Sequence, residues 1–408
     1  MRRDLTRREF MANAALGGLV LGTAWPLMRS LGTQQPPAPK VIYRPLGKTG
    51  VRLPIVSFGV MNSDSPDLLR KALDLGVRHL DTAHGYMGGK SEEVIGTIVA
   101  ERTCRDRVVI GTKLWFARDR EGNFLTADRG PNPGATQENF DRMLGISLKR
   151  LQSDYVDILY LHSCQTAGMV THEPLLKIFA EAKKKGLARF VGISTHSNEP
   201  EVIRAAADSG VWDVVLTAYN YLQGHRDEVR AAIKYAADKG LGVVAMKTQA
   251  GARMNQRRSV NHAAALKWVL NDEHVCTTIP GVTTFEQLEL DWGLMANLKL
   301  TEEEEKDLQL SAATPGSFYC HGCRSCVASC PQQVEIPTAM RAYMYAFAYG
   351  NRRQAHQALA EFADQRGLAP CRDCERCVAS CRHGIPIGAR VQGVLALAGA
   401  HDHSVQQV

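Results

Sequence analysis

Short apolar runs alternate with amphipathic stretches along most of the chain from about residue 42. Brief runs rich in Val, Ile and Leu are typical of buried strands, and apolar residues at helical spacing are typical of helices that cover a sheet. In one such stretch Leu68, Leu69, Ala72 and Leu73 form a single apolar stripe. The sequence predicts strands at 55–60, 79–83, 108–113, 156–162, 190–194, 214–219, 242–247 and 276–280. It predicts helices at 66–75, 92–101, 137–151, 174–185, 199–209, 226–239 and 263–271.

Strands that alternate with helices indicate a parallel sheet, because parallel strands need a crossover connection and this is usually a helix. Eight such units within roughly 260 residues match a (β/α)8, or TIM, barrel. The alternative is an open, doubly wound sheet, which would carry a G-x-G-x-x-G turn after its first strand. No such turn follows residues 55–60. We therefore expect an α/β barrel, with the long loop 117–134 lying over its mouth.

Composition divides the chain into six segments. Residues 1–32 form an N-terminal segment, and residues 33–41 form a linker stiffened by proline. The barrel is expected at 42–300. Residues 301–316 are predicted to form a linking helix, in which Thr301 is the N-cap and Glu304 completes a capping box. A cysteine-rich domain is expected at 317–390 and a tail at 391–408.

The N-terminal segment carries Arg7 and Arg8 in the sequence TRREFM, ahead of an uncharged run at 11–28. This arrangement resembles the twin-arginine export signal. A membrane-anchoring helix is the alternative, although this run is at the lower limit for a span and is interrupted by glycines and Pro26. The resemblance implies an exported protein that is periplasmic, or anchored through this segment to the membrane and facing outward.

Overall composition is that of a globular protein, with 45% hydrophobic and 22% charged residues. The formal net charge is +7, and residues 1–32 hold five arginines against Asp4 and Glu9. No basic stripe with interleaved aromatic residues is present in the sequence. Nucleic acid is therefore not expected as a partner.

Four polar residues stand at or just beyond the carboxyl ends of predicted strands: Asp81, Tyr86, Lys113 and His162. Catalytic groups of barrel enzymes gather at these ends. Hydride reduction of a carbonyl leaves an alkoxide that needs a proton, and a phenol can supply it if an adjacent ammonium lowers its pKa. A buried carboxylate keeps such an ammonium charged and oriented. These four residue types have the chemistry that such a reduction would need.

Together these residues resemble the Asp–Tyr–Lys–His tetrad of the aldo-keto reductases, and the likeness runs from residue 43 to about 294. It implies Tyr86 as the general acid, Lys113 as the cation that tunes it, and Asp81 as the group that orients Lys113. His162 would hold the carbonyl oxygen of a small carbonyl or alcohol substrate.

The same resemblance implies a nicotinamide dinucleotide, NAD(P)(H). The segment 192–194 is similar to the strand of that family whose serine binds the nicotinamide amide, and 279–281 is similar to its pyrophosphate segment. No Arg or Lys adjoins Thr283 and Thr284 to bind a 2′-phosphate, so the choice between NAD and NADP stays open. The implied contacts are Ser194, Asn220, Lys247, Gly281, Thr283 and Gln287.

Eight of the eleven cysteines lie in two matching sets with the spacing C-x2-C-x2-C-x3-C. Their surroundings also match, since SCVASCPQQVEIP is echoed by RCVASCRHGIPI. This clustering indicates metal binding, with zinc as the alternative to iron–sulfur clusters because paired C-x2-C spacings also suit tetrahedral sites. The sets are Cys320, Cys323, Cys326 and Cys330, and Cys371, Cys374, Cys377 and Cys381. Cys104, Cys164 and Cys276 lie outside them and are expected to be buried core thiols.

The two sets resemble those of two-cluster ferredoxins. The resemblance implies two [4Fe–4S] clusters with crossed ligation, in which Cys381 completes the first set and Cys330 completes the second. Arg382 stands where that family usually has proline. Helical patterns at 340–348 and 352–366 predict a small, mostly helical ferredoxin-like domain.

Three functions fit these features. The leading hypothesis is a carbonyl–alcohol oxidoreductase whose clusters exchange electrons with a redox partner protein or a quinone. The second is an electron-transfer protein that uses the barrel as a docking scaffold. The third is a reductase with purely structural clusters.

Overall fold

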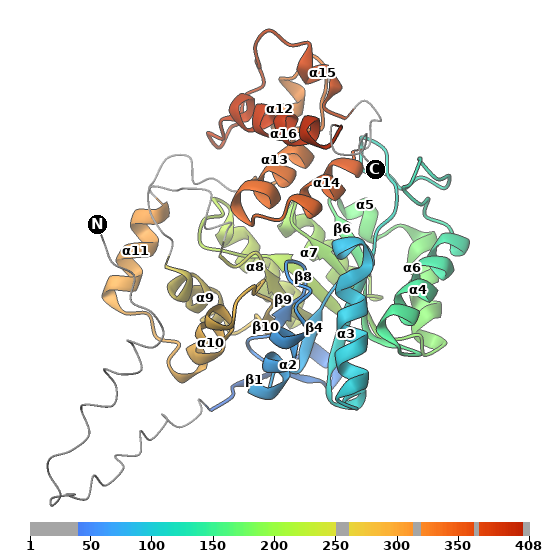
Figure 1. Ribbon diagram of the computed structural model, residues 1–408, viewed down its shortest axis with the longest axis vertical. Helices are drawn as coiled ribbons and strands as arrows, with labels where there is room; N and C mark the ends of the chain where they lie inside the picture. Colours follow the sequence, from blue (N-terminus) through green and yellow to red (C-terminus); the bar gives the residue numbers. More distant parts are fainter. Residues whose placement is uncertain (1–39, 250–260, 313–319, 363–366, 403–408) are drawn as a thin grey trace, which may run out of the picture. The chain divides into compact units, whose positions relative to one another are not determined.

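The computed structural model describes residues 40–249, 261–312, 320–362 and 367–402. Its central sheet has eight parallel strands in sequential order, and bridges from Val56 to Thr278 and from Gly59 to Gly281 close it into a barrel (Figure 1). The expected (β/α)8 fold is confirmed. The strands are β3 (Phe58–Gly59), β4 (His79–Asp81), β5 (Val109–Leu114), β6 (Val156–Cys164), β7 (Ala188–Thr195), β8 (Val214–Ala218), β9 (Gly242–Met246) and β10 (Thr277–Thr278).

Helices between the strands surround the barrel, and the capping residues explain where several of them begin. Ser65 caps the first covering helix by accepting a hydrogen bond from the Leu68 amide, and Pro66 follows at a position where its missing N–H is not needed. These helices are α2 (Pro66–Leu75), α3 (Lys90–Glu101), α4 (Gln137–Leu151), α6 (Glu173–Lys184), α7 (Glu199–Asp208), α8 (Arg226–Asp238), α9 (His262–Leu270) and α10 (Phe285–Gly293). The predicted bounds of α2 and α4 agree with the structure.

A short antiparallel hairpin, β1 (Tyr43–Pro45) and β2 (Arg52–Pro54), precedes the barrel and was not expected from the sequence. Its residues Leu46 and Leu53 are fully buried and belong to the cluster that fills the barrel interior. The hairpin therefore supplies apolar side chains to the interior of the barrel.

Tyr160 of β6 is, with Tyr219, one of the two largest fully buried side chains of the described residues and belongs to the cluster that fills the barrel interior. Its neighbour in the ladder is Gly192 of β7. A Cβ at Gly192 would lie 2.8 Å from the Tyr160 ring and 2.5 Å from the Val214 carbonyl oxygen. Glycine at 192 is thus explained by close packing inside the barrel.

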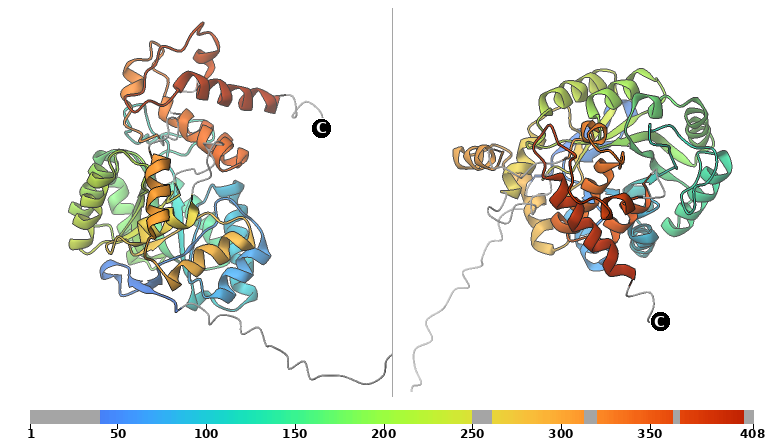
Figure 2. Two further views of the ribbon diagram at one scale, coloured as in Figure 1. Left: turned by 90° about the vertical axis from the view of Figure 1, so that its left-hand side faces the viewer. Right: turned by 90° about the horizontal axis from the view of Figure 1, so that it is seen from above.

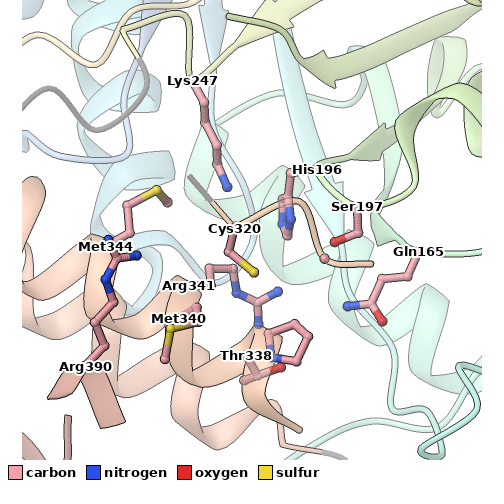
Figure 3. A pocket seen from close by; sticks show the side chains of 12 residues that line it. Gln165, His196, Ser197, Lys247, Cys320, Thr338, Met340, Arg341, Met344 and Arg390 are labelled. Carbon is pink, nitrogen blue, oxygen red and sulfur yellow. The ribbon is translucent and has the colours of Figure 1, made fainter. Parts of the chain in front are cut away.

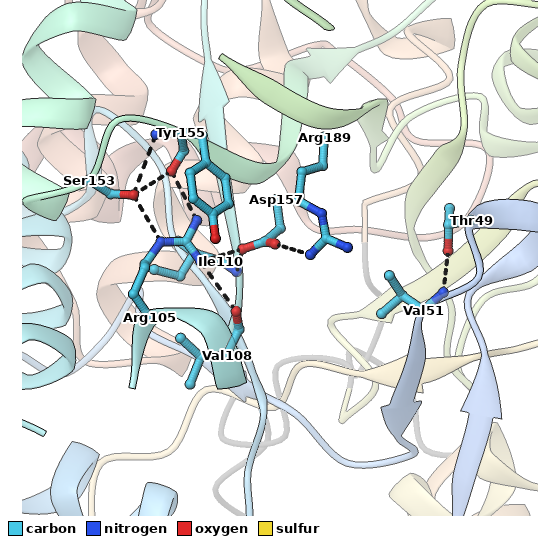
Figure 4. A network of polar contacts seen from close by, with 9 residues as sticks. All are labelled: Thr49, Val51, Arg105, Val108, Ile110, Ser153, Tyr155, Asp157 and Arg189. Atoms are coloured by element: carbon cyan, nitrogen blue, oxygen red, sulfur yellow. Dashed lines mark hydrogen bonds and ion pairs between the residues drawn. The ribbon is translucent and has the colours of Figure 1, made fainter. Parts of the chain in front are cut away.

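Asp157, near the start of β6, gathers a polar network at the opposite end from the strand carboxyl ends (Figure 4). Its carboxylate accepts hydrogen bonds from Arg105 at 2.8 Å, from Arg189 at 2.7 Å and from the Ile110 amide at 2.9 Å. The Asp157 side chain is only 1% exposed, and each of its two carboxylate oxygens pairs with an arginine. At this end of a barrel such a network serves stability.

The linking helix α11 (Glu302–Ala312) has the predicted capping box. The Thr301 hydroxyl accepts from the Glu304 amide at 3.1 Å, and the Glu304 carboxylate accepts from the Thr301 amide at 2.9 Å. A buried ion pair of 2.8 Å between Lys267 and Glu304 ties α11 to α9.

The C-terminal domain is helical, as expected, and has its own apolar core. The predicted tail at 391–408 differs from the structure, because α16 runs through residue 390 and buries Val391 and Val394 in that core. The helical pattern expected at 340–348 is split between an α-helix and a π-turn. The elements are α12 (Ser325–Ala328), α13 (Ile336–Tyr343), the π-turn η6 (Met344–Ala348), α14 (Arg352–Ala360), α15 (Ala369–Arg372) and α16 (Ile387–Asp402).

This helical domain lies over the mouth of the barrel, within one compact unit, Lys40–Val408 (Figure 2). The Asn351 amide donates to the Met61 carbonyl at 3.3 Å and to the Asn62 side chain at 3.0 Å. Asn132, in the long loop expected at the mouth, donates to the Ala360 carbonyl at 2.7 Å. The domain therefore contacts loops that follow the carboxyl ends of the strands, where catalytic groups are expected.

Candidate active site

The structure brings the four residues of the expected tetrad together at the barrel mouth. Asp81 is the last residue of β4, and Tyr86 begins the short turn η2 (Tyr86–Gly89) just beyond it. Lys113 and His162 lie near the carboxyl ends of β5 and β6. Sequential parallel pairing of these strands places their ends side by side.

Lys113 and Asp81 form a buried ion pair beneath the mouth. Their side chains are 1% and 3% exposed, and the Lys113 ammonium also donates to the Thr82 carbonyl at 2.5 Å. Burial lowers the pKa of Lys113 and raises that of Asp81, and in each case the partner's charge opposes the shift. Each charge therefore depends on the other.

The Lys113 ammonium lies over the ring of Tyr86, 5.0 Å from its centroid. We expected this cation to lower the phenol pKa, but the structure shows the opposite direction. Burial first, and then the charge of Asp81, raise the pKa of Tyr86 well above 10. The Lys113 ammonium directs its hydrogen bonds to Asp81 and Thr82. Such a phenol is protonated near neutral pH and can donate a proton, although its raised pKa makes it a weaker acid than a free phenol.

His162 packs edge-to-face against Tyr86, with 5.8 Å between the ring centroids. Burial, followed by the charges of Lys113 and Arg341, lowers the pKa of His162 well below 6.5. The imidazole is therefore neutral and can donate one hydrogen bond without carrying a charge.

A cavity of about 210 Å³ opens above these groups and is lined by Asp81, Tyr86 and His162. Four of the six expected dinucleotide contacts also line it: Lys247, Gly281, Thr283 and Gln287. Among these, the Gln287 side chain accepts from the Thr283 amide at 2.9 Å and fixes the turn before α10. The cavity thus joins the tetrad to the expected pyrophosphate segment.

The other two expected contacts, Ser194 and Asn220, are not among the residues that line this cavity. Ser194 is buried at the end of β7, where its hydroxyl accepts from the Ser163 amide at 2.8 Å. Asn220 follows β8 and is fully buried, and its Nδ2 is a buried donor with no partner among the described residues.

Asp291, which the sequence reasoning missed, also faces the cavity. Its side chain is nearly buried, and burial raises the pKa of its carboxyl to about 7. No hydrogen bond or ion pair reaches it from the described part of the chain. It lies one helical turn beyond Gln287 on α10, so helical spacing could have indicated a shared face.

A small polar cavity lies between the barrel mouth and the first cysteine set (Figure 3). Cys320 lines it, together with His196, Lys247 and Arg341. His196 and Lys247 line the larger cavity as well, so these two side chains separate the first cysteine set from the tetrad. Burial and the charge of Arg341 lower the pKa of Lys247 to about 7.

The cysteines approach one another across the two sets. The thiol pKa of Cys326 is raised to about 12, first by burial and then by Cys320, Cys381 and Cys323. The thiol pKa of Cys371 is raised to about 11, again by burial first, and then by its neighbours Cys330, Cys374 and Cys377. Each set of three thus has the last cysteine of the other set beside it.

Cys104, Cys164 and Cys276 are buried free thiols, as expected. Within the described ranges, no group of three or more His, Cys, Asp or Glu side chains is placed to hold a single metal ion. None of the helices in those ranges is both long and apolar enough to span a bilayer. The expected export signal lies in residues 1–39, outside the described residues.

A barrel mouth that combines a protonated phenol, a buried ammonium–carboxylate pair and a neutral imidazole belongs to an oxidoreductase of carbonyl and alcohol groups. Comparison with known proteins agrees with this class. The chain belongs to the aldo/keto reductase family, whose sequence profile matches residues 57–263. A 4Fe-4S dicluster domain matches residues 319–385.

Two relatives with named activities are similar to part of the chain. It is 28% identical to L-glyceraldehyde 3-phosphate reductase of Escherichia coli O157:H7 over 326 residues, which is 64% of this chain and 90% of that protein. It is 29% identical to L-galactose dehydrogenase of Arabidopsis thaliana over 222 residues, or 50% of this chain and 64% of the relative.

Among solved structures, aldo-keto reductase AKR11C1 from Bacillus halodurans matches with a TM-score of 0.55 and 21% identity, over 69% of this chain and 99% of that one. The thermostable aldo-keto reductase Tm1743 matches with a TM-score of 0.52 and 23% identity, over 66% and 99%. These two likenesses concern the fold.

Proposed function

We propose that this protein interconverts a carbonyl and an alcohol with Tyr86 as the general acid, and that two [4Fe–4S] clusters couple this reaction to one-electron transfer. The observation that carries the proposal is the small cavity in which Cys320 stands beside His196 and Lys247, which also line the cavity of the tetrad. A cluster held at Cys320 would line a cavity that shares His196 and Lys247 with the cavity of the tetrad.

Tyr86 supplies a proton to the oxygen of a substrate carbonyl as that oxygen becomes an alcohol. The neutral His162 donates a second hydrogen bond to the same oxygen. Lys113 keeps its charge because Asp81 accepts its hydrogen bond, and this cation stabilises negative charge that develops on the phenol oxygen.

A nicotinamide dinucleotide fits the residues that are present. Asp291 faces the cavity with a buried carboxyl that has no partner among the described residues, and it could bond to a polar group of such a ligand. Lys247, Gly281 and Gln287 would hold its remaining parts. When bound, the dinucleotide supplies two electrons at once as a hydride.

The eight cysteines fit two clusters with crossed ligation. Cys381 would complete the set of Cys320, Cys323 and Cys326, and Cys330 would complete the other set. The thiol neighbours of Cys326 and Cys371 support this pairing. Each cluster passes one electron, whereas a hydride carries two. Coupling the clusters to the barrel would therefore need a quinone or a redox partner protein that exchanges both single electrons and electron pairs.

We also propose export of the folded protein by the twin-arginine route, supported by Arg7 and Arg8 ahead of an uncharged run. Such a location would be periplasmic, or anchored to the membrane and facing outward. Exchange with a redox partner would then replace exchange with a soluble nicotinamide pool.

The experiment compares Tyr86→Phe with Tyr160→Phe in the full-length protein carrying its clusters. Both changes remove one buried phenol hydroxyl, but the Tyr160 hydroxyl has no hydrogen-bond partner among the described residues and its side chain does not line the cavity. Tyr86→Phe should lower kcat about 100-fold to 10,000-fold while dinucleotide affinity stays nearly intact. Tyr160→Phe should retain most activity. Similar kcat values for the two variants would remove Tyr86 from the acid role.

A further inference from the structure

The catalytic cavity has a wall that the barrel does not supply. Tyr345, Ala348 and Tyr349, all from the C-terminal domain, line the same cavity as Tyr86 and His162. Four hydrogen bonds, two from Asn351 and one each from Arg353 and Asn132, join this domain to the loops at the mouth. The cluster domain is therefore part of the substrate site as well as the place of the cysteine sets.

The segment that forms this wall is a π-turn, η6, inserted between α13 and α14. Single π-turns are rare, and they occur frequently at functional sites. Within this one, Tyr345 is 6% exposed and turns to the cavity, whereas Phe347 is 46% exposed. The turn thus divides its aromatic residues between the substrate site and the outer surface.

Both tyrosines present polar atoms that the protein leaves unused. In the part of the chain that the structure describes, no side chain or backbone group hydrogen-bonds to the hydroxyl of Tyr345 or Tyr349. Their rings lie 5.9 Å apart at an angle of 38°. The Lys247 ammonium lies over one face of the Tyr345 ring, 5.5 Å from its centroid. Two phenols that line a cavity without protein partners are available to hydrogen-bond to a ligand there.

We propose that Tyr345 and Tyr349 recognise the substrate, and that the substrate is a polyhydroxylated carbonyl compound of the carbohydrate or polyol class. Its reacting carbon lies at Tyr86 and His162, and its further hydroxyls bond to the two phenols. Thr248, Gln249 and Asn62 add hydroxyl and amide groups to the same cavity. This inference rests on the proposed carbonyl–alcohol chemistry and adds the class of substrate to it.

Selectivity follows from the unpaired hydroxyls. A site built to hydrogen-bond with a substrate discriminates strongly against an analogue that lacks the partner group, because binding that analogue displaces water from the polar groups of the site and gives them no partner in return. An apolar aromatic aldehyde of similar size should therefore react less well than a hydroxylated one.

The test uses three variants of the full-length protein with its clusters, prepared without oxygen: Tyr345→Phe, Tyr349→Phe and, as a control on the same turn, Phe347→Leu. The value of kcat/KM is measured for an aldose of five or six carbons and for benzaldehyde. Each tyrosine variant should lower kcat/KM for the sugar about 10-fold to 100-fold and leave that for benzaldehyde within about threefold. Phe347→Leu should change neither.

Equal losses for both substrates, or a wild-type preference for benzaldehyde, would overturn the proposal. If the wild type reduces neither compound, the carbonyl–alcohol function itself fails. Binding of the corresponding sugar alcohol, measured by calorimetry, then tests recognition separately. Binding that weakens in both tyrosine variants supports recognition by Tyr345 and Tyr349. Absence of binding to the wild type refutes it.

Discussion

Replacing Lys113 with Met should destabilise the barrel far more than the same change at the surface. The substitution removes the ammonium from a pair whose side chains are 1% and 3% exposed, and it leaves the Asp81 carboxylate buried without a cation. One of its oxygens, Oδ2, already lacks a partner among the described residues. Breaking a buried pair in this way typically costs 3–5 kcal/mol, so we expect a loss of about 4 kcal/mol in the free energy of unfolding.

Lys183→Met is the matched control. Lys183 pairs with Asp213 at 2.7 Å, but their side chains are 40% and 23% exposed. Exposed pairs contribute little, so this change should cost less than about 1 kcal/mol. The double variant Asp81→Asn/Lys113→Met should recover much of the loss, because no charge is then left uncompensated.

The assay is urea unfolding of the full-length protein, monitored by tryptophan fluorescence, to which Trp212 and Trp292 contribute. These side chains are 4% and 3% exposed in the barrel core and report on its unfolding. Similar costs for Lys113→Met and Lys183→Met, or no recovery in the double variant, would refute the account of a buried, mutually dependent ion pair.

Three further predictions concern other parts of the chain. Burial raises the pKa of the Asp291 carboxyl from 3.8 to about 7. The contribution of this carboxyl to the free energy of unfolding is therefore complete below about pH 4 and is lost as pH rises through 7. Asp291→Asn should therefore be more stable than the wild type above pH 7, by up to about 4 kcal/mol, and equal pH slopes of the urea midpoint would contradict this. Cys381→Ser should alter the EPR signal and iron content of the first-set cluster and leave the second intact, with Cys104→Ser as a neutral control, whereas damage to the second cluster would indicate ligation within each set. Replacing Arg7 and Arg8 with Lys should hold the protein in the cytoplasm with its clusters assembled, and continued export would argue for another route.

Features that depend on local pattern were predictable from the sequence. The start and end of α2 agree because Ser65, Pro66 and Gly76 specify its ends chemically. The tetrad was recognisable because strand positions locate the carboxyl ends, and parallel pairing then brings Asp81, Lys113 and His162 together.

Features that are too short to show a pattern, or that depend on contacts distant in sequence, were not predictable. The strands of the β1–β2 hairpin have three residues each, which is too short to show a period of two. The raised pKa of Tyr86 follows from its burial and from the charge of Asp81, which no spacing reveals. Tyr345 and Tyr349 stand at helical spacing, but only the fold shows that they reach a cavity built by other segments.

The central claim is that the clusters exchange electrons with the chemistry at Tyr86. Reduction of a carbonyl to an alcohol takes two electrons and two protons. Two singly reduced clusters hold two electrons, but they pass them one at a time, so a quinone or redox partner must pair them for hydride chemistry. The most direct measurement reduces the clusters chemically without oxygen, removes the reductant, and follows their EPR signals while an aldose is added together with a quinone or a candidate redox partner. The account predicts that the signals decay as the sugar alcohol forms, and that they persist in Tyr86→Phe. Clusters that stay reduced in the wild type with every carbonyl compound and every redox partner would contradict it.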